Sequence, residues 1–108
     1  MNNQLSILIP THNRRAVLIW TLGKLTALGY QEFPWLIYDD GSSPEERLDD
    51  LCAQYGNLSL YRGEVCRGQS WGRSALLSHC TTPYACIMED DTFFLEKPTI
   101  CWKCRKRI

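Results

Sequence analysis

Three consecutive acidic residues, Glu89, Asp90 and Asp91, directly follow an apolar segment of the chain. Carboxylates crowded beside a buried strand are costly unless a positive charge neutralises them. Mg²⁺ and similar hard cations suit this role, because they take one or two protein carboxylates and fill their other positions with phosphate oxygens and water. A solvated acidic turn explains the same residues as well, so this cluster alone leaves both interpretations open.

Other polar residues have the same ambiguity. Asp39 and Asp40 precede a glycine and two serines, which is typical of a turn, although a carboxylate here is also suited to hold a base or a ribose. Arg14 and Arg15 lie where a helix is expected to begin, and they either contact a phosphate or lie on the surface. The sequence contains neither the glycine-rich dinucleotide motif nor a P-loop.

The segments that must position these residues alternate between strand and helix. Short apolar runs predict strands over residues 5–9, 33–38, 58–61 and 84–88, and Pro10 is expected to end the first. Leucines at helical spacing predict a helix over residues 15–28, with Gly29 as its stop, and a weaker helix is predicted over 70–79.

Residues 43–55 are predicted to form one further helix between the second and third strands. Ser43 fits the N-cap, Pro44 the first helical position and Glu46 the capping-box partner. The buried stripe of this helix is expected to contain Leu48, Leu51, Cys52 and Tyr55.

This alternation predicts an α/β fold of three layers, with a mostly parallel sheet between helices. In such sheets ligands bind beyond the carboxyl ends of the strands. Three polar clusters follow strand ends: residues 11–14, Asp39 with Asp40, and the acids at 89–91. Because these ends meet at one edge, the sequence favours a metal–nucleotide site over three unrelated loops.

Size and charge limit the classes of function. A chain of 108 residues makes one small domain, and 12 basic against 12 acidic residues exclude bulk electrostatic binding to nucleic acid or membrane.

We find no transmembrane segment and no signal peptide. The six cysteines are best explained as reduced thiols, which predicts a cytoplasmic protein. Cys101 and Cys104 have CxxC spacing without the further ligands that a zinc site needs.

The sequence resembles the family-2 glycosyltransferases, which have the nucleotide-diphospho-sugar transferase fold called GT-A. The matching stretches are residues 5–14, residues 36–43, the helix that contains Arg73, and residues 87–91. Their order and spacing fit the family over about residues 4–98. Many members have an asparagine after the helix arginine, where this chain has Ser74.

The resemblance implies a role for each matching residue. Asp40, together with Asp39, would hold the base, most often uracil, and Asp90 would contact the ribose or the sugar. Asp91 would bind Mn²⁺ or Mg²⁺ on the diphosphate, with Glu89 as a second metal ligand. The remaining residues would bind the nucleotide sugar: Pro10, Thr11, Asn13 and Arg73.

The reaction that the resemblance implies is transfer of a sugar from a nucleoside diphosphate, with UDP as the expected nucleotide, to an acceptor hydroxyl. Neither the donor sugar nor the acceptor is identified by the sequence. Residues 1–98 are expected to form the donor-binding portion, and residues 99–108 an atypical basic tail that contains cysteines. That tail resembles nothing in the family and is what a frameshift or an early stop would produce.

No acceptor-binding segment and no candidate catalytic base follow Pro98. We therefore expect a truncated chain that lacks transfer activity by itself, and the sequence leaves open whether it is an enzyme. A non-catalytic nucleotide-binding module is the alternative, and a chain that aggregates through its exposed sheet edge is a third outcome.

Overall fold

The computed structural model describes residues 4–90 and the backbone of residues 102–103. Within these residues, five strands form one sheet in the order β3-β2-β1-β4-β5. Four of them are parallel: β1 (Leu5–Thr11), β2 (Trp35–Asp40), β3 (Leu58–Gly63) and β4 (Tyr84–Ile87). The short β5 (Trp102–Lys103) pairs antiparallel with β4, so a piece of the predicted tail extends the same sheet.

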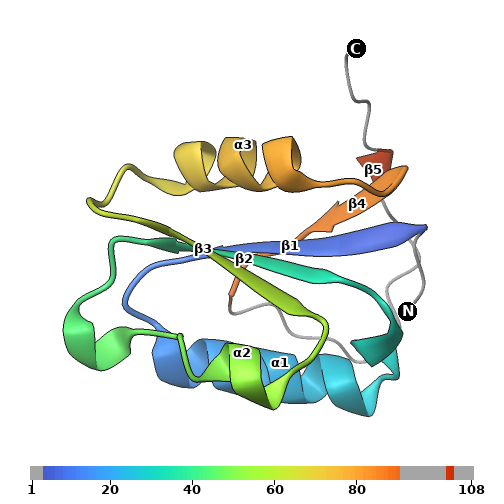
Figure 1. Cartoon of the computed structure of the whole chain (residues 1–108), viewed down its shortest axis with the longest axis horizontal. Helices are drawn as coiled ribbons and strands as arrows, with labels where there is room; N and C mark the ends of the chain where they lie inside the picture. The colour runs from blue at the N-terminus through green and yellow to red at the C-terminus, as the bar shows by residue number, and fades with distance from the viewer. Residues whose placement is uncertain (1–3, 91–101, 104–108) are drawn as a thin grey trace.

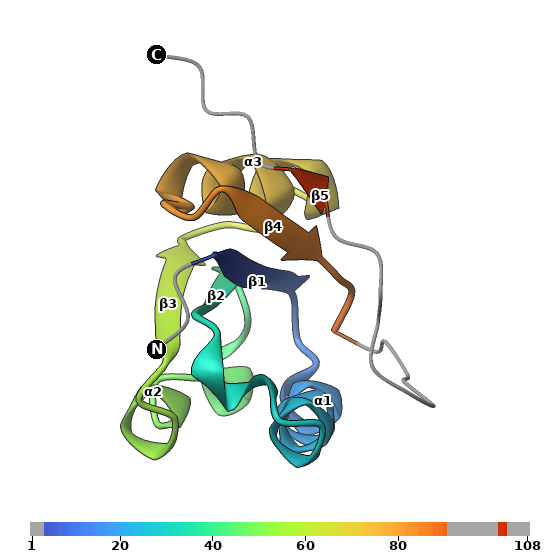
Figure 2. The same ribbon diagram turned by 90° about the vertical axis from the view of Figure 1, so that its right-hand side faces the viewer.

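Helices cover both faces of the sheet. The face that carries α1 (Arg15–Ala27) also carries α2 (Leu51–Gln54), and α3 (Gln69–His79) lies on the opposite face (Figure 1). The view along the sheet separates the three layers clearly (Figure 2). Two short 3₁₀ helices, η1 (Tyr30–Glu32) and η2 (Pro44–Glu46), lie in the connections. The predicted three-layer α/β fold with a mostly parallel sheet is therefore confirmed.

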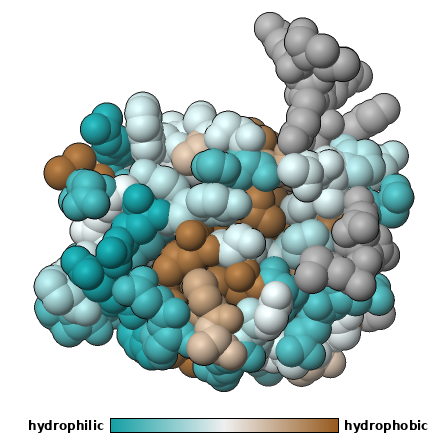
Figure 3. Space-filling view, in the orientation of Figure 1, coloured by the Kyte–Doolittle hydropathy of each residue, from teal (hydrophilic) through white to brown (hydrophobic). Residues whose placement is uncertain are grey.

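Each face of the sheet has its own apolar core. Successive side chains of a strand point to opposite faces, so strands covered on both sides read as continuous apolar runs. Ile37 belongs to the core under α1 and α2, whereas its neighbours Leu36 and Tyr38 belong to the core under α3. Figure 3 shows hydrophobic surface between the two helix layers, on the side where β3 forms the edge of the sheet.

The prediction that Pro10 ends the first strand is wrong, because β1 continues to Thr11. Residues of a parallel strand direct their backbone N–H and C=O groups alternately to the two neighbouring strands. Leu8 faces β4, since its carbonyl oxygen accepts a hydrogen bond from the Met88 N–H at 3.0 Å. The nitrogen of Pro10, two residues later, points to the same side as Leu8, where the pairing with β4 has already ended. Because proline has no N–H to donate on that side, it leaves the pairing with β2 intact.

The second strand begins and ends two residues later than predicted. Asp39 and Asp40 are part of β2, where Asp39 pairs with Thr11 on one side and Arg62 on the other. Pairing on both sides outweighs the turn preference of these residues, and the turn begins only at Gly41, whose φ is +67°. The shift decides which face of the sheet each aspartate occupies.

The single helix predicted over 43–55 is also wrong, since η2 and α2 are separate and short. The Ser43 side chain makes no capping bond. Glu46 Oε2 instead accepts a hydrogen bond from the Arg15 N–H at 3.1 Å and so caps α1. The apolar residues expected to be buried are buried, except that Cys52 is exposed.

The long helices agree with the sequence. The bounds of α1 and α3 fall within one residue of those predicted, and Gly29 follows α1 with a φ of +82°. Gly72 lets α3 approach the sheet, since a Cβ there would lie 3.0 Å from Pro10 Cβ and 3.2 Å from the ring of Tyr38. Close packing against Pro10 holds α3 beside the end of β1.

Two of the broader expectations can be compared with the described residues. No disulfide joins the four cysteines in this part of the chain, and Cys80 and Cys86 are buried as small hydrophobic side chains. No helix in residues 4–90 has the length and apolar character needed to cross a bilayer.

Candidate nucleotide site

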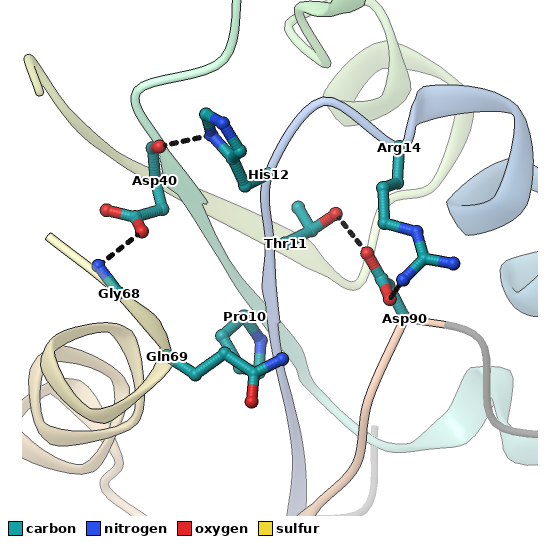
Figure 4. A pocket seen from close by; sticks show the side chains of 8 residues that line it. All are labelled: Pro10, Thr11, His12, Arg14, Asp40, Gly68, Gln69 and Asp90. Carbon is teal, nitrogen blue, oxygen red and sulfur yellow. Dashed lines mark hydrogen bonds and ion pairs between the residues drawn. The ribbon is translucent and has the colours of Figure 1, made fainter. Parts of the chain in front are cut away.

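A pocket of about 180 Å³ lies beyond the carboxyl ends of β1, β2 and β4 (Figure 4). The structure brings together here four of the residues predicted for a nucleotide-sugar site, and four that were not in that set. The lining residues are Pro10, Thr11, His12, Arg14, Asp40, Gly68, Gln69 and Asp90. The convergence of the three polar clusters at one edge of the sheet is therefore observed, although the role of each residue stays a prediction.

Asp40 is held by the loop that leads into α3. Its carboxylate accepts hydrogen bonds from the backbone N–H groups of Arg67 and Gly68, both at 2.8 Å. The Cys66 thiol donates a third, at 3.3 Å. Asp40 is 5% exposed, so the carboxylate is nearly buried and already has three donors.

These contacts set the charge state of Asp40. Burial is the largest single influence and acts to raise the pKa of its carboxyl, whereas the two backbone N–H groups act to lower it. The Cys66 thiol and the nearby His12 lower it further, and together these groups outweigh burial, so the pKa ends below its ordinary value of 3.8. The same hydrogen bond, together with burial, raises the pKa of the Cys66 thiol, so the site holds a carboxylate beside a protonated thiol.

The lowered pKa of Asp40 predicts an acid-dependent stability. The folded carboxyl binds a proton less readily than the unfolded one, so its contribution is complete above about pH 4 and is lost as the pH falls through the folded-state pKa. We expect Asp40→Asn to be less stable than the wild type at pH 7, with the difference shrinking at pH 3. Urea unfolding at both pH values measures this, and an unchanged difference would contradict it.

Asp39 lies on the other face of the sheet. It shares that face with Ile37, under α1 and α2, and its side chain is fully buried away from the pocket lining. Oδ1 accepts a hydrogen bond from the Ser42 N–H at 3.1 Å, which orders the turn after β2. Oδ2 has no hydrogen-bond partner among the described residues. Of the two aspartates, the pocket therefore contains Asp40.

Asp90 closes the pocket from the end of β4. Its Oδ2 accepts a hydrogen bond from Thr11 Oγ1 at 2.8 Å, and its backbone carbonyl accepts one from Thr21 Oγ1 at 2.6 Å. Arg14 Nη1 lies 3.6 Å from Oδ1, and this ion pair is one of the dashed contacts in Figure 4. The carboxylate is thus fixed by both β1 and α1, and it is 5% exposed.

Asn13 connects two loops and does not line the pocket. It has a φ of +51°, and its Oδ1 accepts a hydrogen bond from the Ser43 N–H at 2.8 Å. Its own N–H donates to Ser42 Oγ at 2.9 Å. Asparagine tolerates a positive φ better than most residues, which explains its place in this connection. Its observed contacts tie the end of β1 to the turn after β2.

The arginines separate into two groups. Arg15 donates two 2.6 Å hydrogen bonds to the Asp50 carboxylate and lies outside the pocket lining. Arg14, next to it, lines the pocket. Arg73 donates to Gln69 Oε1 at 3.3 Å and lies 4.0 Å from Glu89 Oε1, which places both predicted residues at the rim next to Gln69.

Four pocket residues were not among the predicted site residues, although Arg14 had been considered as a phosphate contact: His12, Arg14, Gly68 and Gln69. His12 Nδ1 lies 2.7 Å from the Asp40 carbonyl oxygen, in hydrogen-bonding contact. His12 and Arg14 belong to the polar cluster that follows β1, which was the available signal. Gly68 and Gln69 became recognisable only through the fold, because the start of α3 packs against the end of β1.

The acids at the end of β4 fit a hard cation in part. In residues 4–90, no group of three His, Cys, Asp or Glu side chains forms a complete metal site. Asp91, the main predicted ligand, lies outside the described residues. Asp90 supplies oxygen donors in the pocket and Glu89 supplies them beside it. Mg²⁺ or Mn²⁺ needs only one or two protein carboxylates when phosphate oxygens complete its coordination. The donors present are therefore compatible with a metal–diphosphate complex.

Known structures share this fold. Residues 1–349 of S. aureus TarS, in complex with UDP, superpose with a TM-score of 0.70 at 20% identity over 82% of this chain and 27% of that one. The mannosyltransferase PcManGT from Pyrobaculum calidifontis, in complex with GDP-Man and Mn²⁺, gives 0.70 at 16% identity over 84% of this chain and 28% of that one. At these identities the likeness shows the fold alone, and it confirms the predicted GT-A type.

This chain spans less than a third of the length of either solved chain. No curated protein matches its sequence at a significant level. The family model of glycosyl transferase family 2, by contrast, matches residues 6–100, which is most of the chain. The protein therefore belongs to glycosyl transferase family 2.

Proposed function

We propose that this chain binds a nucleoside-diphosphate sugar as the donor-binding part of a glycosyltransferase, with residues 1–98 as that portion. The observation that carries the proposal is the pocket in which Asp40 and Asp90 face one space from the ends of two strands. Binding of UDP by TarS and of GDP-Man with Mn²⁺ by the mannosyltransferase supports a nucleotide-sugar ligand. UDP is the nucleotide that we expect.

Different residues would contact different parts of the donor. Asp40, kept ionised by its backbone donors, would accept hydrogen bonds from the base, and the pocket wall beside it would include Pro10 and Thr11. Asp90, held by Thr11, would contact the ribose or the sugar. Asn13 would act through the loop that it orders, and Asp39 through the turn after β2.

The diphosphate would lie toward the acids at the end of β4. Glu89 and Asp91 would hold Mn²⁺ or Mg²⁺ there, and Arg73 would approach from α3, since it lies 4.0 Å from Glu89. A bound cation of this kind acts as a Lewis acid that stabilises the departing diphosphate. Acceptor binding and the catalytic base are not assigned to any described residue.

Calorimetric titration of UDP and GDP into the purified chain, with and without Mn²⁺, tests the proposal. We expect Mn²⁺-dependent binding of UDP that is lost in Asp91→Ala. Glu45→Ala is the control, because it removes an exposed acid outside the pocket. A folded chain that binds neither nucleotide would overturn the proposal.

A parallel assay for release of UDP from UDP-sugars separates the two function classes. Release would show that the chain acts as an enzyme. Nucleotide binding without release would favour the non-catalytic module.

A further inference from the structure

Thr21 is a polar residue in the middle of the apolar face of α1. Its neighbours on that face are Leu18, Leu22 and Leu25, all buried in the core between α1 and the sheet. Thr21 is itself 0% exposed. A buried hydroxyl is costly unless it makes a hydrogen bond, and a valine of nearly the same shape would avoid that cost. Packing alone therefore does not explain the hydroxyl at this position.

The hydroxyl of Thr21 reaches out of its own helix. A threonine within a helix commonly donates to the carbonyl one turn earlier. Thr26 does so, with its hydroxyl 3.0 Å from the carbonyl oxygen of Leu22. Thr21 Oγ1 instead donates to the backbone carbonyl of Asp90 at 2.6 Å, across 69 residues of chain. This distance is at the short end of the range for such bonds, so α1 is firmly tied to the acidic segment after β4.

Asp90 is thus held at two different points by two threonines. Thr11 Oγ1 donates to the side-chain atom Oδ2 at 2.8 Å, which is one of the dashed contacts in Figure 4. Thr21 holds the main chain. The carboxylate of Asp90 therefore has an anchor on β1, and the backbone of the same residue has a separate anchor on α1.

The backbone anchor lies between the two acids to which we assign the cation. Glu89 precedes Asp90 and Asp91 follows it. The Met88 N–H still donates to a carbonyl of β1, and Thr21 holds the chain two residues later. Ligands of a metal must be placed to within about 0.5 Å, and residues that hold them without touching the metal change its affinity by about 10–100-fold.

We propose that Thr21 is a positioning residue for the divalent cation. Its hydroxyl fixes the main chain at Asp90, so that Glu89 and Asp91 meet the cation together. This inference rests on the proposed function, since it assumes a cation on these two acids. It predicts that loss of the hydroxyl weakens metal-dependent binding and spares the contacts with the nucleoside, whose carboxylates have anchors of their own.

The test compares Thr21→Val with the wild type in three calorimetric titrations. Mn²⁺ alone is expected to bind about tenfold more weakly to the variant, because its ligands are less well placed. UDP at a fixed Mn²⁺ concentration should weaken by a similar factor, because fewer chains carry the cation. Uridine without metal should bind equally to both proteins, since Asp40 and the bond from Thr11 to Asp90 are retained.

Thr21→Ser separates positioning from packing. It keeps the hydroxyl but removes a methyl group from the core, so its melting temperature should fall below that of the wild type. Its Mn²⁺ affinity should nevertheless stay within about twofold of the wild-type value. If Thr21 served packing alone, the Mn²⁺ affinity would follow the melting temperature through both variants.

Thr26→Val is the matched control. It makes the same substitution on the same helix and removes a hydrogen bond to a carbonyl of α1 itself. It should change none of the three titrations, and a thermal melt checks that each variant is folded.

Three results would count against the inference. Unchanged Mn²⁺ affinity in folded Thr21→Val would overturn it while leaving the proposed function intact. Equal weakening of Mn²⁺ and uridine, or a Thr21→Ser variant that binds Mn²⁺ as poorly as Thr21→Val, would assign Thr21 a role in packing only. A wild-type chain that shows no Mn²⁺-dependent binding of UDP would overturn the proposed function and this inference with it.

Discussion

Gly41→Ala is expected to lower the free energy of unfolding by about 3 kcal/mol or more. Gly41 has a φ of +67°, and an added Cβ would lie 2.7 Å from the carbonyl carbon of Val65 and 2.8 Å from the nitrogen of Cys66. Both contacts are with backbone, so no side chain can rotate away. The loop must move, and it carries the N–H groups of Arg67 and Gly68 away from Asp40.

Urea unfolding measures the stability of Gly41→Ala, and UDP titration measures its effect on the pocket. Binding should weaken more than about tenfold, since the donors of Asp40 are displaced. Gly23→Ala is the control: this position lies within α1 and has open space around it, so the change should stabilise the protein by about 0.5–1 kcal/mol. A Gly41→Ala variant as stable as the wild type would contradict the packing described.

Asp40→Ala has the second large expected effect. It leaves the backbone N–H groups of Arg67 and Gly68 without their acceptor, and each unsatisfied donor costs about 1–3 kcal/mol when buried. We expect a loss of about 2–5 kcal/mol in unfolding free energy. The proposed contact to the base is lost as well, so UDP affinity should fall more than about 100-fold.

The comparison for Asp40→Ala is Asp49→Ala. Asp49 is an acid with a 64% exposed side chain that pairs with Arg62 at the surface, and removing it should cost less than about 1 kcal/mol. Unfolding in urea and titration with UDP are measured on both variants. Wild-type UDP affinity in a folded Asp40→Ala protein would remove Asp40 from the site.

Much of the fold could be predicted because its signals are local. Leucines at helical spacing identified α1, and short apolar runs identified four strands. The general rule that ligands bind at the carboxyl ends of parallel strands then predicted one polar edge. The pocket observed at that edge contains Thr11, Asp40 and Asp90 from three separate segments.

The finer features depend on contacts that no local pattern contains. A shift of two residues in β2 placed Asp39 and Asp40 within the strand, and the alternation of side chains then put them on opposite faces. Arg14 and Arg15 are adjacent and of the same type, yet contacts with Asp50 and with the Arg47 carbonyl hold Arg15 outside the pocket lining. Likewise the Glu46 side chain caps α1 through the N–H of Arg15, which lies 31 residues earlier in the chain. It does not cap the turn in which it lies.

The central place of β1 has a consequence for how this protein folds during synthesis. β1 lies between β2 and β4 and is synthesised before both, and Ser6 reaches its hydrogen-bond partner Thr82 across 76 residues of chain. Contacts between such distant segments close large loops and form slowly. One edge of β1 therefore stays open until β4 has been made, and over that interval this apolar strand is exposed to pairing with other polypeptides.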